Sequence, residues 1–94
     1  MNEFTMVQYT TQLERDLKAQ YNHDLNQVSD IFQTLYKIIH NIVQDPYEMK
    51  FRALKKSNSM VQRVISANPS VIKFLALFGF EEDNEKYFMD VPKT

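Results

Sequence analysis

The clearest pattern in the sequence is a run of apolar residues that recurs every three or four positions between residues 25 and 43. The apolar residues of this run are Leu25, Val28, Ile31, Phe32, Leu35, Ile38, Ile39, Ile42 and Val43. On a helix with 3.6 residues per turn, such positions fall on one wide face. Asn22 and Asp24 precede the run and can accept hydrogen bonds from the first backbone amides of a helix. We therefore predict a long amphipathic helix, buried along one side.

A shorter helix is predicted before this one. Leu13, Leu17 and Tyr21 are spaced four residues apart, so residues 11–21 are expected to form an amphipathic helix. Residues 1–10 are expected to be a flexible N-terminal segment.

A third helix is predicted after the long one. Asp45 precedes Pro46, a pair typical of a helix N-terminus, and Glu48 could complete a capping box. The apolar face of this helix would carry Tyr47, Phe51 and Leu54. Its outward face would carry Arg52, Lys55 and Lys56.

Two more helices are predicted toward the C-terminus. Asn58 can cap a short helix whose inward residues are Met60, Val61, Val64 and Ile65. The pair Asn68-Pro69 repeats the cap-and-proline pattern before a last helix with Val71, Ile72, Phe74, Leu75 and Phe78 on its apolar face. Gly79, the single glycine of the chain, is expected to end that helix in the left-handed conformation.

The end of the chain reads as a β-hairpin. Residues 80–82 and 87–91 resemble two short strands, and the polar residues 83–86 between them could form a four-residue turn. An isolated two-stranded hairpin is marginally stable, so it must pack on the helices. The predicted class is α+β: a small helical domain with a short C-terminal antiparallel β-hairpin or sheet.

The composition limits the chain to one domain and excludes several kinds of site. A chain of 94 residues has room for a single core, so residues 11–94 are expected to form one domain. One glycine excludes glycine-rich phosphate loops, and the absence of cysteine excludes disulfides and thiolate chemistry. The longest apolar run, residues 74–80, is far shorter than the roughly 20 residues of a membrane-spanning helix. A reducing compartment is expected, cytoplasmic with a nuclear alternative.

Residues that could support catalysis are not grouped in the sequence. His23 and His40 have no cysteine partner, and the serines lack a nucleophile motif. The acidic run at residues 81–83 has no second cluster at ligand spacing. We expect no enzymatic activity, no cofactor and no metal site.

Charge is distributed unevenly along the chain. Residues 46–74 contain six basic residues and one acidic residue, whereas residues 1–45 contain three basic and six acidic, and residues 75–94 two basic and five acidic. A basic centre between acidic flanks suits a small anionic ligand. It does not suit a long nucleic-acid track, for which the whole domain would be basic.

Four short segments in order resemble the PUB domain, also called PUG. They are Asn-Ile-Val-Gln-Asp-Pro at 41–46, Lys-Phe-Arg-Ala-Leu-Lys at 50–55, Ser-Asn at 57–58 and Gly-Phe-Glu-Glu at 79–82. PUB domains are found in cytoplasmic peptide:N-glycanase, in certain UBX-domain proteins and in the linear-ubiquitin ligase. The resemblance covers residues 41–82 and implies a PUB-like α+β fold.

The resemblance also implies a binding module for the acidic C-terminal tail of the AAA ATPase valosin-containing protein. Other tyrosine-containing peptide motifs are further expected partners, in ubiquitin-dependent protein quality control and ER-associated degradation. By position, the tail pocket would be formed by Asn41, Lys50, Phe51, Lys55 and Asn58, with Ser57 and Met60 at its edge. Leu54 would join Phe51 in an apolar wall for a leucine or tyrosine side chain.

Other interpretations of the same residues stay open. Phe51 and Leu54 could be core residues only, Asn58 a helix cap only, and Asn41 a partner of backbone groups at the end of the long helix. A rival function is a nucleic-acid-binding helical domain that uses the basic segment 50–63, which the overall acidic charge disfavours. A third is an assembly module whose aromatic faces pack on another subunit. No membrane association is expected.

Overall fold

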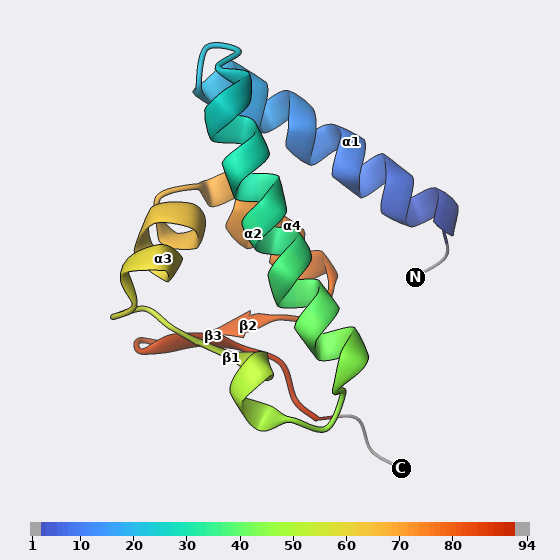
Figure 1. The fold of residues 1–94 in the computed structure, drawn as a ribbon, viewed down its shortest axis with the longest axis vertical. Helices are drawn as coiled ribbons and strands as arrows, with labels where there is room; N and C mark the ends of the chain where they lie inside the picture. Colours follow the sequence, from blue (N-terminus) through green and yellow to red (C-terminus); the bar gives the residue numbers. More distant parts are fainter. Residues whose placement is uncertain (1–2, 92–94) are drawn as a thin grey trace.

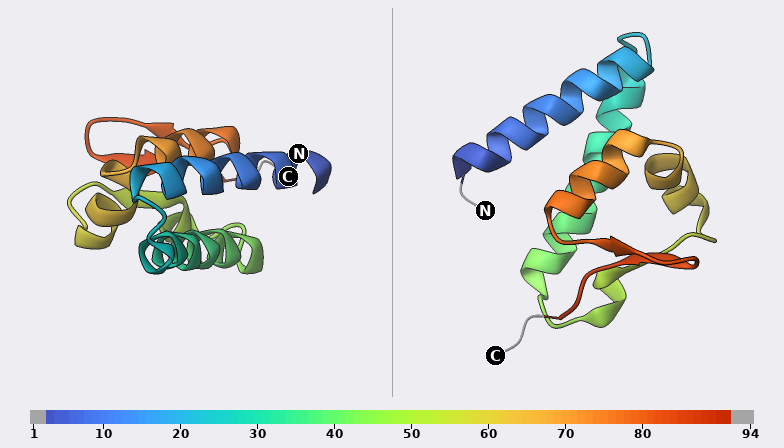
Figure 2. Two further views of the ribbon diagram at one scale, coloured as in Figure 1. Left: turned by 90° about the horizontal axis from the view of Figure 1, so that it is seen from above. Right: turned by 180° about the vertical axis from the view of Figure 1, so that it is seen from behind.

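The predicted long helix, α2 (Leu25–Gln44), crosses one side of the molecule, and α1, α4 and the sheet lie on the other side (Figures 1 and 2). The computed structural model describes residues 3–91. Its other elements are α1 (Glu3–Gln20), η1 (Met49–Arg52), β1 (Ala53–Lys55), α3 (Ser59–Val61), η2 (Gln62–Ser66), α4 (Pro69–Leu77), β2 (Glu81–Glu82) and β3 (Lys86–Phe88).

The three strands form one antiparallel sheet in the order β1-β3-β2. Leu54 of β1 and Glu82 of β2 both pair with Tyr87 of the central strand β3. Helices and a small antiparallel sheet together confirm the predicted α+β class.

A single core joins the helices to the sheet. The helices α1, α2, α3 and α4 and the helical turn η2 all contribute apolar residues to it, and the sheet contributes Tyr87. The buried apolar residues are Leu13, Leu17, Val28, Ile31, Leu35, Ile38, Val61, Val64, Ile65, Val71, Phe74, Leu75, Phe80 and Tyr87. The four from α2 belong to the predicted apolar face, so the periodicity identified the buried side of the helix. Leu25 and Val43, at the two ends of that predicted face, are exposed instead.

Most predicted caps are present, because a cap depends only on residues three or four positions away. Asp24 accepts hydrogen bonds from the backbone amides of Asn26 and Gln27 at the start of α2. Gly79 has φ +106° directly after the C-cap of α4. Its amide donates to the Ala76 carbonyl, and the Phe80 amide donates to the Leu75 carbonyl. These two bonds form a Schellman motif, which turns the chain from α4 into β2.

Asn68 stands at the N-cap position of α4, but its side chain makes no capping hydrogen bond there, contrary to the prediction. Its side chain is fully buried, and its Nδ2 donates to the Val64 carbonyl at 2.8 Å and to the Arg63 carbonyl at 3.2 Å. Its Oδ1 accepts from Gln20 Nε2 at 2.8 Å and from the Tyr21 hydroxyl at 2.5 Å. One amide thus satisfies carbonyls at the end of η2 and fastens the C-terminal end of α1 to them.

The predicted third helix is wrong. Residues 49–52 form one 3₁₀ turn, and the chain then becomes strand β1, which pairs with β3. Asp45 ends α2 by donating its amide to the Asn41 carbonyl, and Glu48 is the N-cap of η1. The helical pattern was overridden because the hairpin needs a third strand to be stable, and β1 supplies it.

Arg52 does not point outward as expected but is 6% exposed. Its Nε donates to the Pro46 carbonyl at 2.8 Å, and a terminal guanidinium nitrogen donates to the Asp90 carbonyl at 2.9 Å. The Met89 amide donates back to the Arg52 carbonyl. Arg52 therefore ties the segment after α2 to the segment after β3.

The first helix begins earlier than predicted. α1 starts at Glu3 rather than near residue 11, so most of the segment expected to be flexible is helical. The periodic residues Leu13 and Leu17 are buried as predicted. The helix extends past the rest of the fold toward its N-terminus (Figure 1).

Two carboxylates with lowered pKa values make the stability of the fold depend on pH in the acidic range. Hydrogen bonds from the Gln27 side chain and backbone lower the pKa of Asp24, and bonds from the Glu85 and Lys86 amides lower the pKa of Asp83. Because these pKa values lie below the ordinary 3.8, the stabilisation is present above pH 3.8 and is lost as pH falls through the folded-state values.

We expect Asp83→Asn to flatten this dependence, because the amide keeps an acceptor oxygen but has no charge to titrate. Urea unfolding followed by circular dichroism, at about pH 6 and about pH 3, measures the difference in free energy of unfolding for both proteins. An equal loss in parent and variant would contradict the assignment to Asp83.

Candidate peptide-binding groove

A groove of about 380 Å³ lies where η1, β1 and α3 meet. Its lining residues are Lys50, Ala53, Leu54, Lys55, Ser57, Asn58, Met60 and Val61. Six of the eight predicted peptide-binding residues are among them: Lys50, Leu54, Lys55, Ser57, Asn58 and Met60. The turn between β1 and α3 brings them together, because it folds the start of α3 back beside the strand.

The floor of the groove is apolar, and its residues are held by packing against the core. Val61 is 2% exposed and belongs to the core, and Leu54 and Met60 are partly buried against it. Leu54 is also fixed by its position opposite Tyr87 in the sheet. Leu54 is therefore not a core residue only, because the same side chain also lines the groove.

Asn58 holds one side of the groove in place. Its Oδ1 accepts from the Met60 amide at 2.9 Å and from the Val61 amide at 3.2 Å, so it is the predicted cap of α3. Its Nδ2 takes no part in the cap, and the residue is exposed. The cap fixes the orientation of the amide group, which leaves this N–H₂ able to donate to a ligand.

Lys50 and Lys55 are the cations of the groove. Both are exposed, and within residues 3–91 neither forms an ion pair; Lys50 Nζ lies 5.4 Å from the centre of the Phe51 ring. Of the other basic residues of segment 46–74, Lys73 is exposed on α4 and does not line the groove, whereas Arg52, Lys56 and Arg63 have partners. Lys56 pairs with Glu82, whose hydrogen bond raises the pKa of Lys56, and Arg63 pairs with Asp30.

Two predicted site residues do not line the groove. Phe51 is half-buried and supports Lys50 from below. Asn41 is exposed on α2, eleven residues after Asp30, which puts the two about 20° apart around the helix axis. Asp30 pairs with Arg63 of η2, so Asn41 projects from α2 in roughly the direction of that pair, about three helical turns farther along the helix. Asn41 does not line the groove.

Comparison with known proteins bears on this arrangement. The model of the family described as the PUB domain matches residues 25–94. The chain belongs to the PUB domain family. PUB domains are protein-interaction domains, and the groove is a concave surface suited to that role.

A curated relative of this PUB domain is "Plant UBX domain-containing protein 2" of Arabidopsis thaliana. The two are 36% identical over 62 residues, which is 62% of this chain and 14% of the plant protein. The chain thus spans a small part of that relative. No solved structure matches the chain significantly.

Two residues that line the groove, Ala53 and Val61, were not predicted as site residues from the sequence. Ala53 was assigned to a helix, so its place on a strand beside the groove could not be seen. Val61 is predicted as a core residue, but the sequence does not distinguish a core residue at the floor of a groove from a core residue elsewhere.

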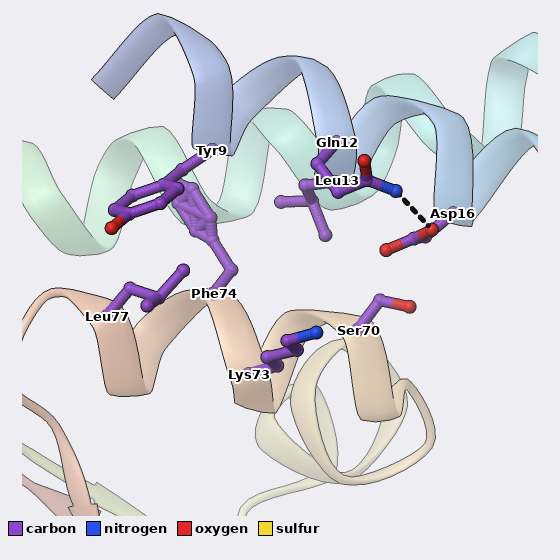
Figure 3. A pocket seen from close by; sticks show the side chains of 8 residues that line it. All are labelled: Tyr9, Gln12, Leu13, Asp16, Ser70, Lys73, Phe74 and Leu77. Atoms are coloured by element: carbon purple, nitrogen blue, oxygen red, sulfur yellow. Dashed lines mark hydrogen bonds between the residues drawn. The ribbon is translucent and has the colours of Figure 1, made fainter. Parts of the chain in front are cut away.

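Two of the other hollows in the described structure bear on the position of the site. One, of about 490 Å³, adjoins the groove and shares Lys55 and Ser57 with it; the others of its lining residues are Lys56, Asn84, Glu85 and Lys86. The second, of about 230 Å³, lies between α1 and α4, with Leu13 and Phe74 at its base (Figure 3). It contains no predicted peptide-binding residue, and half of its lining comes from α1, which precedes the family match.

Two searches of the described residues gave no site of another kind. Among residues 3–91, histidine and acidic side chains form no group of three or more that could hold a metal ion. In the same range, no helix combines the length and the apolar character needed to span a membrane.

Proposed function

We propose that this PUB domain binds the acidic C-terminal tail of the AAA ATPase valosin-containing protein in the groove between η1, β1 and α3. The observation that carries the proposal is that Lys50 and Lys55, two cations without an ion pair in the described chain, line one groove with an apolar floor. By binding the tail, the domain would recruit its parent protein to ubiquitin-dependent protein quality control.

Each part of the groove matches one part of such a tail. Lys55 would pair with a tail carboxylate or lie along a tyrosine ring, and Lys50 would add charge attraction. Leu54, Met60 and Val61 would receive the leucine or tyrosine side chain. The exposed Nδ2 of Asn58 would donate to a backbone carbonyl of the peptide, and Asn41 would hold the peptide where it leaves the groove. Other tyrosine-containing peptide motifs present the same chemistry.

The rival nucleic-acid function finds less support. Of the five basic residues in the segment 50–63, Arg52 is buried, and Lys56 and Arg63 are held by Glu82 and Asp30. Lys50 and Lys55 are the two of that segment without an ion pair in the described residues. Two cations in one small groove do not form the extended track of positive charge that a phosphate backbone requires.

Titration with a synthetic acidic peptide that ends in leucine and tyrosine tests the proposal. We expect a Kd of about micromolar, since the groove is small and offers few charge-assisted contacts. Binding should weaken as salt rises, because the two lysines are exposed. A peptide of the same length with glutamine and asparagine at the acidic positions is the matched control. Absence of binding at about millimolar peptide would end the proposal.

A further inference from the structure

Ser57 stands on the ridge between the groove and the adjoining hollow. It lies in the turn between β1 and α3, is exposed, and lines both concave surfaces. Lys55 is the other residue that lines both. A group added to the Ser57 hydroxyl would therefore project near Lys55, one of the two unpaired cations of the groove.

The Ser57 hydroxyl has no structural task in the described chain. Thr10 and Thr34 donate to carbonyls of their own helices, and Ser66 is bonded to the Tyr87 hydroxyl. Within residues 3–91, Ser57 Oγ forms no hydrogen bond. It is thus accessible to an enzyme, and its modification breaks no contact that holds the fold.

We propose that Ser57 is a phosphorylation site and that its modification closes the groove to acidic peptides. The inference rests on the proposed function for its consequence. Two lysines, Lys55 and Lys56, directly precede Ser57, a charge pattern that suits a serine kinase selective for basic substrates. Ser57 Oγ attacks the γ-phosphorus of ATP as the bond to the β-phosphate oxygen breaks. ADP leaves, and the hydroxyl proton passes to the base of the kinase.

The physical effect follows from charge. A phosphoserine carries about −1.5 to −2 at neutral pH, which offsets the two positive charges of Lys50 and Lys55. It also supplies three acceptor oxygens that Lys55 can reach in place of a ligand carboxylate. An acidic peptide would lose its attraction and meet a like charge at the edge of the groove. We expect the affinity to fall at least about tenfold.

Ser59 provides a matched control two residues away. It is exposed like Ser57 and follows the same two lysines, but it is the first residue of α3 and does not line the groove. We would treat the protein with ATP and the catalytic subunit of cyclic-AMP-dependent protein kinase, and map the phosphate by mass spectrometry. Ser57→Ala and Ser59→Ala, treated alike, isolate each position, and binding of the acidic peptide is titrated before and after treatment.

The expected result is phosphate on Ser57 and, after kinase treatment, at least tenfold weaker peptide binding in the parent and in Ser59→Ala. In Ser57→Ala, the affinity measured before and after treatment should be the same. Ser57→Glu should bind weakly without kinase, whereas Ser59→Glu should bind like the parent. No phosphate at Ser57, or unchanged affinity with Ser57 phosphorylated, would overturn the inference. If the untreated protein binds no acidic peptide, the proposed function fails, while the mass spectrum still decides whether Ser57 is modified.

Discussion

Replacing Asn68 by alanine should lower the free energy of unfolding by about 3 kcal/mol. The substitution removes four hydrogen bonds and leaves the carbonyls of Arg63 and Val64 without their donor in a buried place. For a domain of this size, the loss corresponds to a fall in Tm of roughly 15 °C. Urea and thermal unfolding followed by circular dichroism measure both quantities.

Asn26→Ala is the control for this experiment. Asn26 is exposed near the start of α2, and its side chain has no hydrogen bond in the described chain, so the change should stay within about 0.5 kcal/mol. Equal stabilities of the Asn68 and Asn26 variants would show that the buried amide does not hold α1 to the rest of the fold.

The second large effect is expected for Lys55→Glu, which should weaken binding of the acidic peptide about 50-fold. The change removes one charge-assisted contact and places a carboxylate against another, which together amounts to about 2–3 kcal/mol. Folding should be unaffected, because Lys55 is exposed and forms no ion pair in residues 3–91. Isothermal titration gives the affinity, and circular dichroism confirms the fold.

Lys73→Glu is the charge-matched control for Lys55→Glu. Lys73 is also exposed but lies on α4 beside the hollow shared with α1 (Figure 3). It makes the same change in net charge without touching the groove. If both variants weaken binding equally, the attraction is a general effect of net charge and the groove is not the site.

The parts of the fold that could be predicted are those fixed by near neighbours. The cap at Asp24, the cap at Asn58 and the turn at Gly79 each depend on residues within about five positions, and all three are present. The apolar face of α2 was also visible, because a helix repeats its burial every turn.

The parts that could not be predicted depend on distant partners. Residues 53–55 carry a helical spacing, but the presence of β3, some thirty residues later, makes them a strand. Asn68 has the local signature of a helix start. Its burial arises only when α1, nearly fifty residues earlier in the chain, docks on it.

The candidate site shows the same division. Lys50, Lys55, Ser57 and Asn58 are close in sequence, so their nearness was predictable, and with residues 53–55 as a strand they line one groove. Asn41 belongs to another element, and its distance from the groove depends on how α2 packs. Its role in binding stays a prediction.

Because β3 is the central strand, proteolysis near it should affect the groove more than the helices. Within residues 3–91, the one strand that pairs with β1 is β3, and β1 forms a wall of the groove. Arg52 donates a hydrogen bond to the carbonyl of Asp90, just beyond β3. Cleavage in the exposed turn at residues 83–85 would thus detach the neighbour of β1 while α1, α2 and α4 keep their shared core. A nicked or C-terminally shortened molecule would retain most of its helix content and yet lose its recognition surface.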